Sequence, residues 1–251
     1  MKIQEWRRLA LCSVGLLTAV LLVSLTGMLH PLAGNNLSGE ENGTGTASER
    51  LQDIAHVEAH GRDENGPAVT QEPRRQYVVV IDAGHGGDDE GTGSTDWKYR
   101  EKDYALKVAD CLKEILDGTD IKAYYTRTDD REVSKEERVR LAKKVGADAL
   151  ISIHCNASDL NETTAKGVET LYSSRKATTK NGLSSKELAH NMLDAVCEMT
   201  GRQKRKVIRR DRLYLMHHAD MPVTIVEIGF MTNRSDMALS LIHISEPTRP
   251  Y

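Results

Sequence analysis

The stretch YVVVID, Tyr77 to Asp82, places the strongest constraint on the fold, because it carries no charged residue before its last position. A continuous apolar run predicts a strand buried on both faces, as in parallel sheets that helices cover on each side. A helical pattern follows from Glu101 to Gly118, where apolar residues recur every three or four positions. The chain therefore begins its folded part with a strand and then a helix.

The alternation of strands and helices continues along the chain. Two more predicted helices each begin with a capping box, a serine followed three positions later by a glutamate, and end at a glycine; they cover residues 134–146 and 184–201. Further strands are predicted for IKAYYTR (121–127), DALISIHCNA (148–157), GVETLYSS (167–174) and VTIVEIGF (223–230). This order predicts a single α/β domain with a mostly parallel, twisted sheet flanked by helices.

The N-terminal 30 residues differ from the rest. A basic start, MKIQEWRR, precedes the segment from Leu9 to Leu29, which contains no charged residue. About 20 apolar residues suffice for a helix to cross a bilayer, and the basic flank should stay in the cytoplasm. We expect residues 1–30 to be an uncleaved transmembrane signal anchor, with a cleaved signal peptide as the alternative. Both interpretations predict an exported protein, and the first makes the membrane a partner.

Two further segments are not expected to belong to the fold. Residues 31–76 are polar, rich in Gly, Asn and Glu, and lack sustained apolar periodicity, which predicts a flexible linker. Residues 239–251, LSLIHISEPTRPY, resemble the translation of an adapter used in sequencing-library preparation. The folded domain is therefore expected to cover residues 77–238 and to lack its natural C-terminus.

Charge and cysteine content exclude several classes of protein. The formal net charge is only −3, which gives no reason to expect nucleic-acid binding. The 4 cysteines form no C-x-x-C pair, so neither a zinc ribbon nor a disulfide framework is indicated. The basic segment RQKRKVIRR, residues 202–210, is expected to be a solvated connection rather than a surface for anionic polymers.

Three predicted strands end in polar residues that suit metal chemistry. His85 follows the first strand, His154 lies at the end of the third, and Glu227 lies near the end of the last. The carboxyl ends of parallel strands meet at one edge of a sheet, where ligands bind. Glu101 begins a helix and can point back to the same edge. The glycines around His85 let the backbone turn sharply and leave room for a substrate.

Two imidazoles and one carboxylate with an open fourth position form a common arrangement for catalytic zinc. A second carboxylate would then act as general base for a metal-bound water. The spacing alone does not show which glutamate is the ligand and which is the base. A single histidine at a strand end is more often structural, and Glu101 alone could be a carboxylate favoured by the helix dipole, but an apolar strand rarely holds an unpaired acid such as Glu227. The coincidence of two histidines and an acid at three strand ends favours a metal site.

Several segments together resemble the zinc-dependent N-acetylmuramoyl-L-alanine amidases of peptidoglycan, the type 3 amidase family. The resemblance covers the folded domain from about Val78 to Asn233 and rests on VVVIDAGHGGDDEG, REKDYALKVADCLKEIL, YYTRTDD, EERVRLAKKVGADALISIHCNA, GVETLY and MPVTIVEIGFMTN. It implies that His85, Glu101 and His154 bind one Zn²⁺ per chain and that Glu227 is the catalytic carboxylate. It also implies peptidoglycan as the partner and cleavage of the bond between N-acetylmuramic acid and L-alanine, with the domain facing the cell wall. A zinc peptidase acting on wall peptides and a non-catalytic wall-binding regulator are the alternatives.

Three residues near the predicted site have less certain roles. Arg127 follows a strand on the same edge, where it would contact either substrate carboxylates or a structural partner, namely Asp129, Asp130 or a helix. Asn156 lies just beyond His154 and is a candidate substrate contact, with a turn residue as the alternative. Cys155 should face the opposite side of its strand from His154 and be buried and inert.

Overall fold

The computed structural model of the protein describes residues 76–159, 164–177 and 182–238, all within one compact unit. The elements in chain order are β1 (Tyr77–Ala83), α3 (Glu101–Leu116), β2 (Ile121–Tyr125), α4 (Lys135–Lys144), β3 (Ala149–Asn156), β4 (Val168–Tyr172), α5 (Ser185–Thr200), β5 (Lys204–Arg209), α6 (Tyr214–His218) and β6 (Val223–Phe230). Residues 234–238 begin another helical segment.

The predictions for the two ends of the chain concern residues outside this part of the molecule. The anchor or signal peptide in residues 1–30, the linker up to residue 75 and the adapter-derived segment 239–251 are not among the described residues. Within the ranges that are described, no helix combines the length and the apolar character that crossing a membrane requires.

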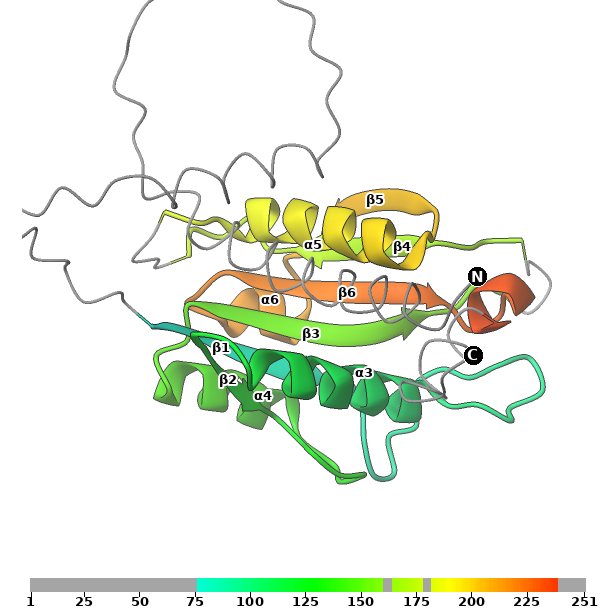
Figure 1. Ribbon diagram of the computed structural model, residues 1–251, viewed down its shortest axis with the longest axis horizontal. Coiled ribbons are helices and arrows are strands. Elements are labelled where there is room, and N and C mark those ends of the chain that lie inside the picture. The colour runs from blue at the N-terminus through cyan, green and yellow to red at the C-terminus, as the bar shows by residue number, and fades with distance from the viewer. Residues whose placement is uncertain (1–75, 160–163, 178–181, 239–251) are drawn as a thin grey trace, which may run out of the picture. The chain divides into compact units, whose positions relative to one another are not determined.

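The strands form one six-stranded sheet in the order β2-β1-β3-β6-β4-β5 (Figure 1). Parallel pairing joins β2 to β1, β1 to β3, and β3 to β6, so these four strands have their carboxyl ends at one edge. β4 pairs antiparallel with β6 and parallel with β5. The predicted α/β domain with a mostly parallel sheet is confirmed, and the reversed β4–β5 pair is its one departure from parallel pairing.

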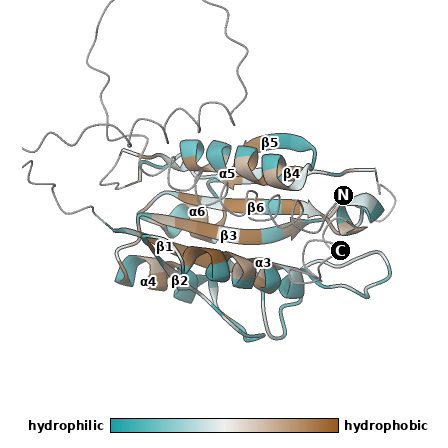
Figure 2. Ribbon diagram, in the orientation of Figure 1, coloured by the Kyte–Doolittle hydropathy of each residue, from teal (hydrophilic) through white to brown (hydrophobic). Residues whose placement is uncertain are grey.

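Helices cover both faces of the sheet, as the apolar run of β1 before Asp82 requires. Val79 and Ile81 belong to a core shared with α3 and α5, whereas Val80 belongs to a second core shared with α4 and α6. Figure 2 shows apolar residues concentrated on the central strands and polar residues on the outer surfaces of the helices. The central residues of β1 therefore pack alternately against the two helical layers, which fixes the position of the loop that follows the strand.

The predicted helix starts are confirmed in atomic detail. Ser134 and Ser184 each accept a hydrogen bond from the backbone N–H of the glutamate three residues later, and each glutamate bonds back to its serine. α5 ends at Gly201, whose φ of 64° is the left-handed conformation that glycine adopts without strain.

The expectation of a solvated connection at residues 202–210 was wrong, because Lys204–Arg209 form the edge strand β5. The outward-facing side chains of this strand, including Lys204 and Lys206, are exposed, and Figure 2 shows the strand as largely hydrophilic. Charged side chains are common on edge strands, where they discourage pairing with other chains. The run of basic residues, which had indicated a connecting segment, is therefore a feature of the edge strand.

Candidate metal centre and active site

His85, Glu101 and His154 come together at the edge where the parallel strands end. The Oε1 atom of Glu101 lies 2.8 Å from Nδ1 of His154, and its Oε2 atom lies 3.1 Å from Nε2 of His85. One potential ligand atom from each residue lies within 4.8 Å of the others. The imidazole rings of the two histidines are 4.9 Å apart, edge to face. The structure thus brings together the three residues expected to bind zinc, with donor types that Zn²⁺ prefers.

The glycines beside His85 make this arrangement sterically feasible. A Cβ atom on Gly84 would lie 2.5 Å from Cε1 of His154, and one on Gly91 would lie 2.6 Å from Oε2 of Glu101. His85 has a φ of 59°, a conformation that is uncommon for a residue with a side chain. Glycine is therefore required where the backbone passes the imidazole and carboxylate groups, and the loop holds His85 in a strained conformation.

Glu101 is buried and fully engaged as an acceptor. Besides the two imidazoles, its carboxylate accepts hydrogen bonds from the backbone N–H groups of Cys155, at 2.9 Å, and Thr92, at 2.8 Å. Burial alone would raise the pKa of Glu101, but the hydrogen bonds and charges of His154 and His85 lower it well below its ordinary value. This carboxylate is held ionised, as a metal ligand must be.

Asp89 is a neighbour of the centre that sequence reasoning missed. Its Oδ1 atom lies 2.8 Å from Nδ1 of His85, on the side of the ring away from Glu101. Burial would lower the pKa of His85, but Glu101 and then Asp89 raise it above its ordinary value. A carboxylate on the far nitrogen of a ligand histidine orients the ring, so Asp89 fits a supporting role. The only signal in the sequence was its position four residues after His85.

Glu227 lies beside the three candidate ligands but is not bonded to them. On the sheet it is the direct neighbour of His154, because the two residues are paired in the β3–β6 register. Its Oε2 atom is buried and has no hydrogen-bond partner among the described residues. Burial raises the pKa of Glu227 to about 7, an effect that His154 opposes and that the nearby Glu101 and Glu169 carboxylates strengthen. The two glutamates of the site are therefore in opposite electrostatic environments.

Of the three other residues near the predicted site, Arg127 is buried and hydrogen-bonded within the protein. Its side chain is 2% exposed, and its guanidinium donates to the backbone carbonyls of Ala83, Gly84, Lys102 and Asp129. Of the partners expected within the protein, a helix is present, because the carbonyl of Lys102 belongs to α3, whereas the bond to Asp129 is to the carbonyl oxygen rather than to the carboxylate. These bonds leave Arg127 committed to the protein rather than presented to a substrate.

The two residues after His154 have different environments. Asn156 is partly exposed and donates from Nδ2 to Oε2 of Glu169, at 3.0 Å, so its role as a substrate contact stays a prediction. Cys155 is buried, and burial raises the pKa of its thiol well above the ordinary value, in keeping with an inert side chain.

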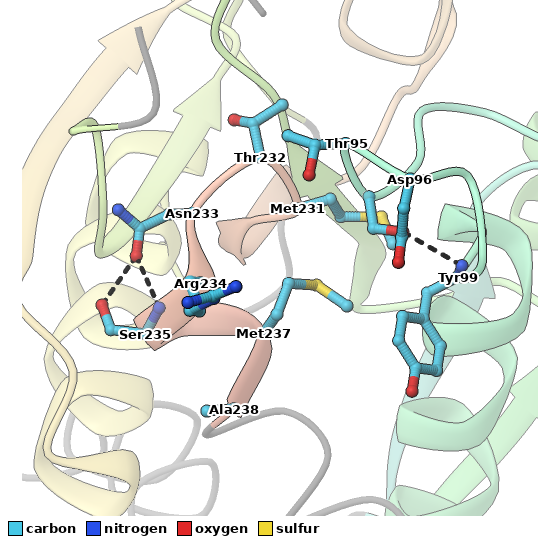
Figure 3. A pocket seen from close by; sticks show the side chains of 11 residues that line it. Thr95, Asp96, Tyr99, Met231, Thr232, Asn233, Arg234, Ser235, Met237 and Ala238 are labelled. Atoms are coloured by element: carbon cyan, nitrogen blue, oxygen red, sulfur yellow. Dashed lines mark hydrogen bonds between the residues drawn. The ribbon is translucent and has the colours of Figure 1, made fainter.

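A hollow of about 510 Å³ lies between the loop that leads into Glu101 and the segment that follows β6, and none of the candidate metal ligands lines it. Figure 3 shows Asp96 and Tyr99 on one side of it and Met231 and Met237 facing them. Several polar groups that line the hollow already have partners within the protein, as Thr232 does in its bond with Ser158. The lining of the hollow is therefore separate from the candidate metal centre.

Comparison with known proteins finds similarity to cell-wall amidases. A family model described as N-acetylmuramoyl-L-alanine amidase matches residues 79–241. A curated protein, "Probable cell wall amidase LytH" of Staphylococcus aureus, is 30% identical over 165 residues, which make up 65% of this chain and 51% of that protein. The chain thus spans about half the length of the curated relatives it matches.

Solved structures of similar proteins share the fold. The N-acetylmuramoyl-L-alanine amidase from Clostridium difficile 630 is 36% identical with a TM-score of 0.59, covering 64% of this chain and 84% of that one. The catalytic domain of CwlV from Bacillus (Paenibacillus) polymyxa var. colistinus is 31% identical with a TM-score of 0.58, covering 64% of this chain and 85% of that one.

Proposed function

Because the chain belongs to the type 3 N-acetylmuramoyl-L-alanine amidase family, we propose that it is a zinc-dependent hydrolase of peptidoglycan. The bond cleaved is the amide between N-acetylmuramic acid and L-alanine, and the result is remodelling of the cell wall. One observation carries the proposal: His85, Glu101 and His154 converge on one point, and beside them lies Glu227, whose Oε2 atom has no hydrogen-bond partner among the described residues.

The three convergent residues fit a zinc ion. Two imidazoles and one carboxylate, with space for a fourth ligand, make up a common catalytic zinc site, and their potential ligand atoms lie within 4.8 Å of one another. We assign His85, Glu101 and His154 as the ligands of one Zn²⁺ per chain. When bound, the ion supplies Lewis acidity, which acidifies a water molecule and polarises the carbonyl of the scissile amide.

Glu227 is assigned as the catalytic carboxylate. A general base works best when its pKa lies near the working pH, and burial raises the pKa of Glu227 to about 7. Its Oε2 atom, with no hydrogen bond to give up, accepts a proton from the attacking water and returns it to the leaving amine of L-alanine. Glu101 is unsuited to this task, because both imidazoles and two backbone N–H groups engage its oxygens.

The decisive experiment is mass spectrometry of purified peptidoglycan digested with the zinc-loaded, full-length chain. Free stem peptides that begin with L-alanine, together with glycan that has lost its peptides, are the expected products. Shortened stem peptides still attached to muramic acid would indicate a zinc peptidase instead. Intact peptidoglycan, despite one bound zinc per chain, would contradict the hydrolase and favour a wall-binding protein.

The assignment of Glu227 has its own test. Glu227→Gln should retain zinc and lose activity by about 10² to 10⁴, the usual contribution of a general base. Glu198→Gln, which changes an exposed glutamate on α5 in the same way, is the matched control and should keep wild-type activity. Full activity of Glu227→Gln would remove Glu227 from the reaction.

We also propose that the domain acts outside the cytoplasmic membrane, facing the cell wall, with residues 1–30 as its anchor. Support comes from the charge-free segment Leu9 to Leu29 and from the cell wall role in the description of the staphylococcal relative. Protease added to intact cells from which the wall has been removed should digest the domain. Digestion only after the membrane is broken would overturn this placement.

A further inference from the structure

Two buried arginines lie beneath the loop that carries His85, and the proposed reaction uses neither. Arg127 follows β2 and is 2% exposed, and Arg138 belongs to the first half of α4 and is 5% exposed. A buried guanidinium is costly unless its N–H groups find acceptors. The hydrogen-bond acceptors of Arg127 and Arg138 therefore show which parts of the chain these buried side chains hold in place.

Three consecutive carbonyl oxygens at the end of β1 point to the two guanidinium groups. The oxygen of Ala83 accepts from Nε of Arg127 at 3.0 Å and from Nη1 of Arg138 at 2.7 Å. The oxygen of Gly84 accepts from Nη2 of Arg127, and that of His85 accepts from Nη2 of Arg138, both at 2.8 Å. These bonds hold the backbone of the loop in the strained conformation that His85 adopts, with its φ of 59°.

Arg127 also connects this loop to the second ligand. Its Nη2 atom donates to the carbonyl of Lys102 at 2.7 Å, in the first turn of α3 and directly after Glu101. The guanidinium group of Arg127 thus donates hydrogen bonds both to the loop that carries His85 and to the helix that begins with Glu101. The loop approaches Arg127 closely, since a Cβ atom on Gly86 would lie 3.0 Å from its Cδ atom.

Arg138 is fixed in turn by Asp82, which is fully buried. Its Nη1 atom donates to Oδ1 of Asp82, which also accepts from the hydroxyl of Thr126 at 2.7 Å. The other carboxylate oxygen accepts from the hydroxyl of Ser152 at 2.6 Å, on β3 two residues before His154. Asp82 therefore anchors Arg138 to the strand that carries the third ligand.

We propose that Arg127 and Arg138 are positioning residues that hold His85 and Glu101 in the geometry for metal binding before the metal arrives. The inference rests on the proposed role of His85, Glu101 and His154 as zinc ligands. Arginine is required because its planar fork of N–H groups reaches carbonyl oxygens that lie in different directions. Lysine keeps the positive charge but offers its hydrogens from a single nitrogen.

The test compares Arg127→Lys and Arg138→Lys with the unaltered full-length chain. Zinc affinity is measured by competition with a chromophoric chelator, and the geometry of the centre by the visible absorption spectrum of the protein saturated with Co²⁺. Each substitution should weaken zinc binding by about 10- to 100-fold, the usual effect of removing a group that orients a ligand. The Co²⁺ spectra of the variants should also differ from that of the unaltered protein.

Arg202→Lys is the matched control. Arg202 is 7% exposed and also donates to backbone carbonyls, those of Ile228 within β6 and Asp236 after it, but neither carbonyl belongs to a segment that carries a proposed zinc ligand. This variant should lose stability while keeping zinc affinity and the Co²⁺ spectrum. If the Arg127 and Arg138 variants behave as Arg202→Lys does, the two arginines only stabilise the fold and the inference is overturned.

Two further outcomes are also decisive. If the unaltered chain binds no zinc, the ligand assignment fails and this inference fails with it. If the unaltered chain binds zinc and the two arginine variants bind it equally well, only this inference is overturned. If a variant does not fold, the Nε–H of Arg127 in the unaltered, metal-free protein is followed by NMR. Slow exchange of this proton with solvent supports preorganisation, and fast exchange that slows only after zinc is added contradicts it.

Discussion

Glu227→Gln should make the metal-free protein more stable at alkaline pH, because it removes a carboxylate that folding takes out of water. Burial raises the pKa of Glu227 from the ordinary 4.5 to about 7. Between these values the folded chain holds a proton that the unfolded chain has released. The stability linked to this group is therefore present below about pH 4.5 and is lost as the pH rises through about 7.

The magnitude follows from the pKa difference. Each tenfold change in proton affinity is worth about 1.4 kcal/mol, so complete titration corresponds to about 3 kcal/mol. Most of this falls between about pH 5 and about pH 8, over which the unaltered protein should lose about 2 to 3 kcal/mol relative to Glu227→Gln. In a domain of this size the melting temperatures should separate by about 5 to 10 °C over that range.

The assay is thermal unfolding in the presence of a chelator at a series of pH values, followed by circular dichroism. Glu137→Gln is a control for which the expected change in stability has the opposite sign. Hydrogen bonds from the backbone N–H and hydroxyl of Ser134 lower the pKa of Glu137, so this variant should be less stable than the unaltered chain above about pH 4.5. Parallel pH profiles for Glu227→Gln and the unaltered protein would refute the reasoning. Bound zinc should reduce the difference in stability between Glu227→Gln and the unaltered protein at high pH, because a nearby cation favours the ionised carboxylate.

Four further predictions concern the loop, the helices and the metal. Gly84→Ala should weaken zinc binding at least about tenfold by calorimetry, because its Cβ atom would lie 2.5 Å from Cε1 of His154. Gly146→Ala, at a φ of 63° with nothing within 4 Å of the new Cβ, should cost about 1 kcal/mol in a denaturant melt and leave zinc binding unchanged. Ser184→Ala removes the cap of α5 and should lower the free energy of unfolding by about 1 kcal/mol with unaltered activity. Chelator should abolish the release of amines from peptidoglycan and Zn²⁺ should restore it, whereas activity that survives chelation would contradict the zinc assignment.

The fold and the meeting of the candidate ligands followed from local patterns in the sequence. The apolar run before Asp82 required two covering layers of helices, and the capping boxes marked where two helices begin. Once the strands were parallel, the ends of β1 and β3 had to share an edge, so His85 and His154 had to approach each other. These inferences depend only on the order and the spacing of residues.

Other features depend on information that a local pattern does not contain. The reversal of β4 relative to β6 leaves no trace in the alternation of side chains, which is the same for either strand direction. The edge strand β5 was missed because its exposed lysines and arginines also occur in solvated connections. Arg127 was correctly placed near the active edge, but the direction of a long side chain depends on which carbonyls need a donor, and only the folded structure shows that.

Spacing left open which glutamate of the site binds metal and which moves the proton, and the environments of the two carboxylates favour one assignment. Glu101 accepts hydrogen bonds from two backbone N–H groups and lies against both imidazoles, and these contacts lower its pKa. Glu227 lies on β6, next to the strand that carries His154. Its Oε2 atom is buried and has no hydrogen-bond partner among the described residues, and burial raises the pKa of Glu227 to about 7. A ligand must stay ionised, whereas a proton acceptor must be able to take up and release a proton near neutral pH. When two neighbouring carboxyl groups differ in this way, the difference in their pKa values supports the proposed assignment, with Glu101 as the ligand and Glu227 as the base.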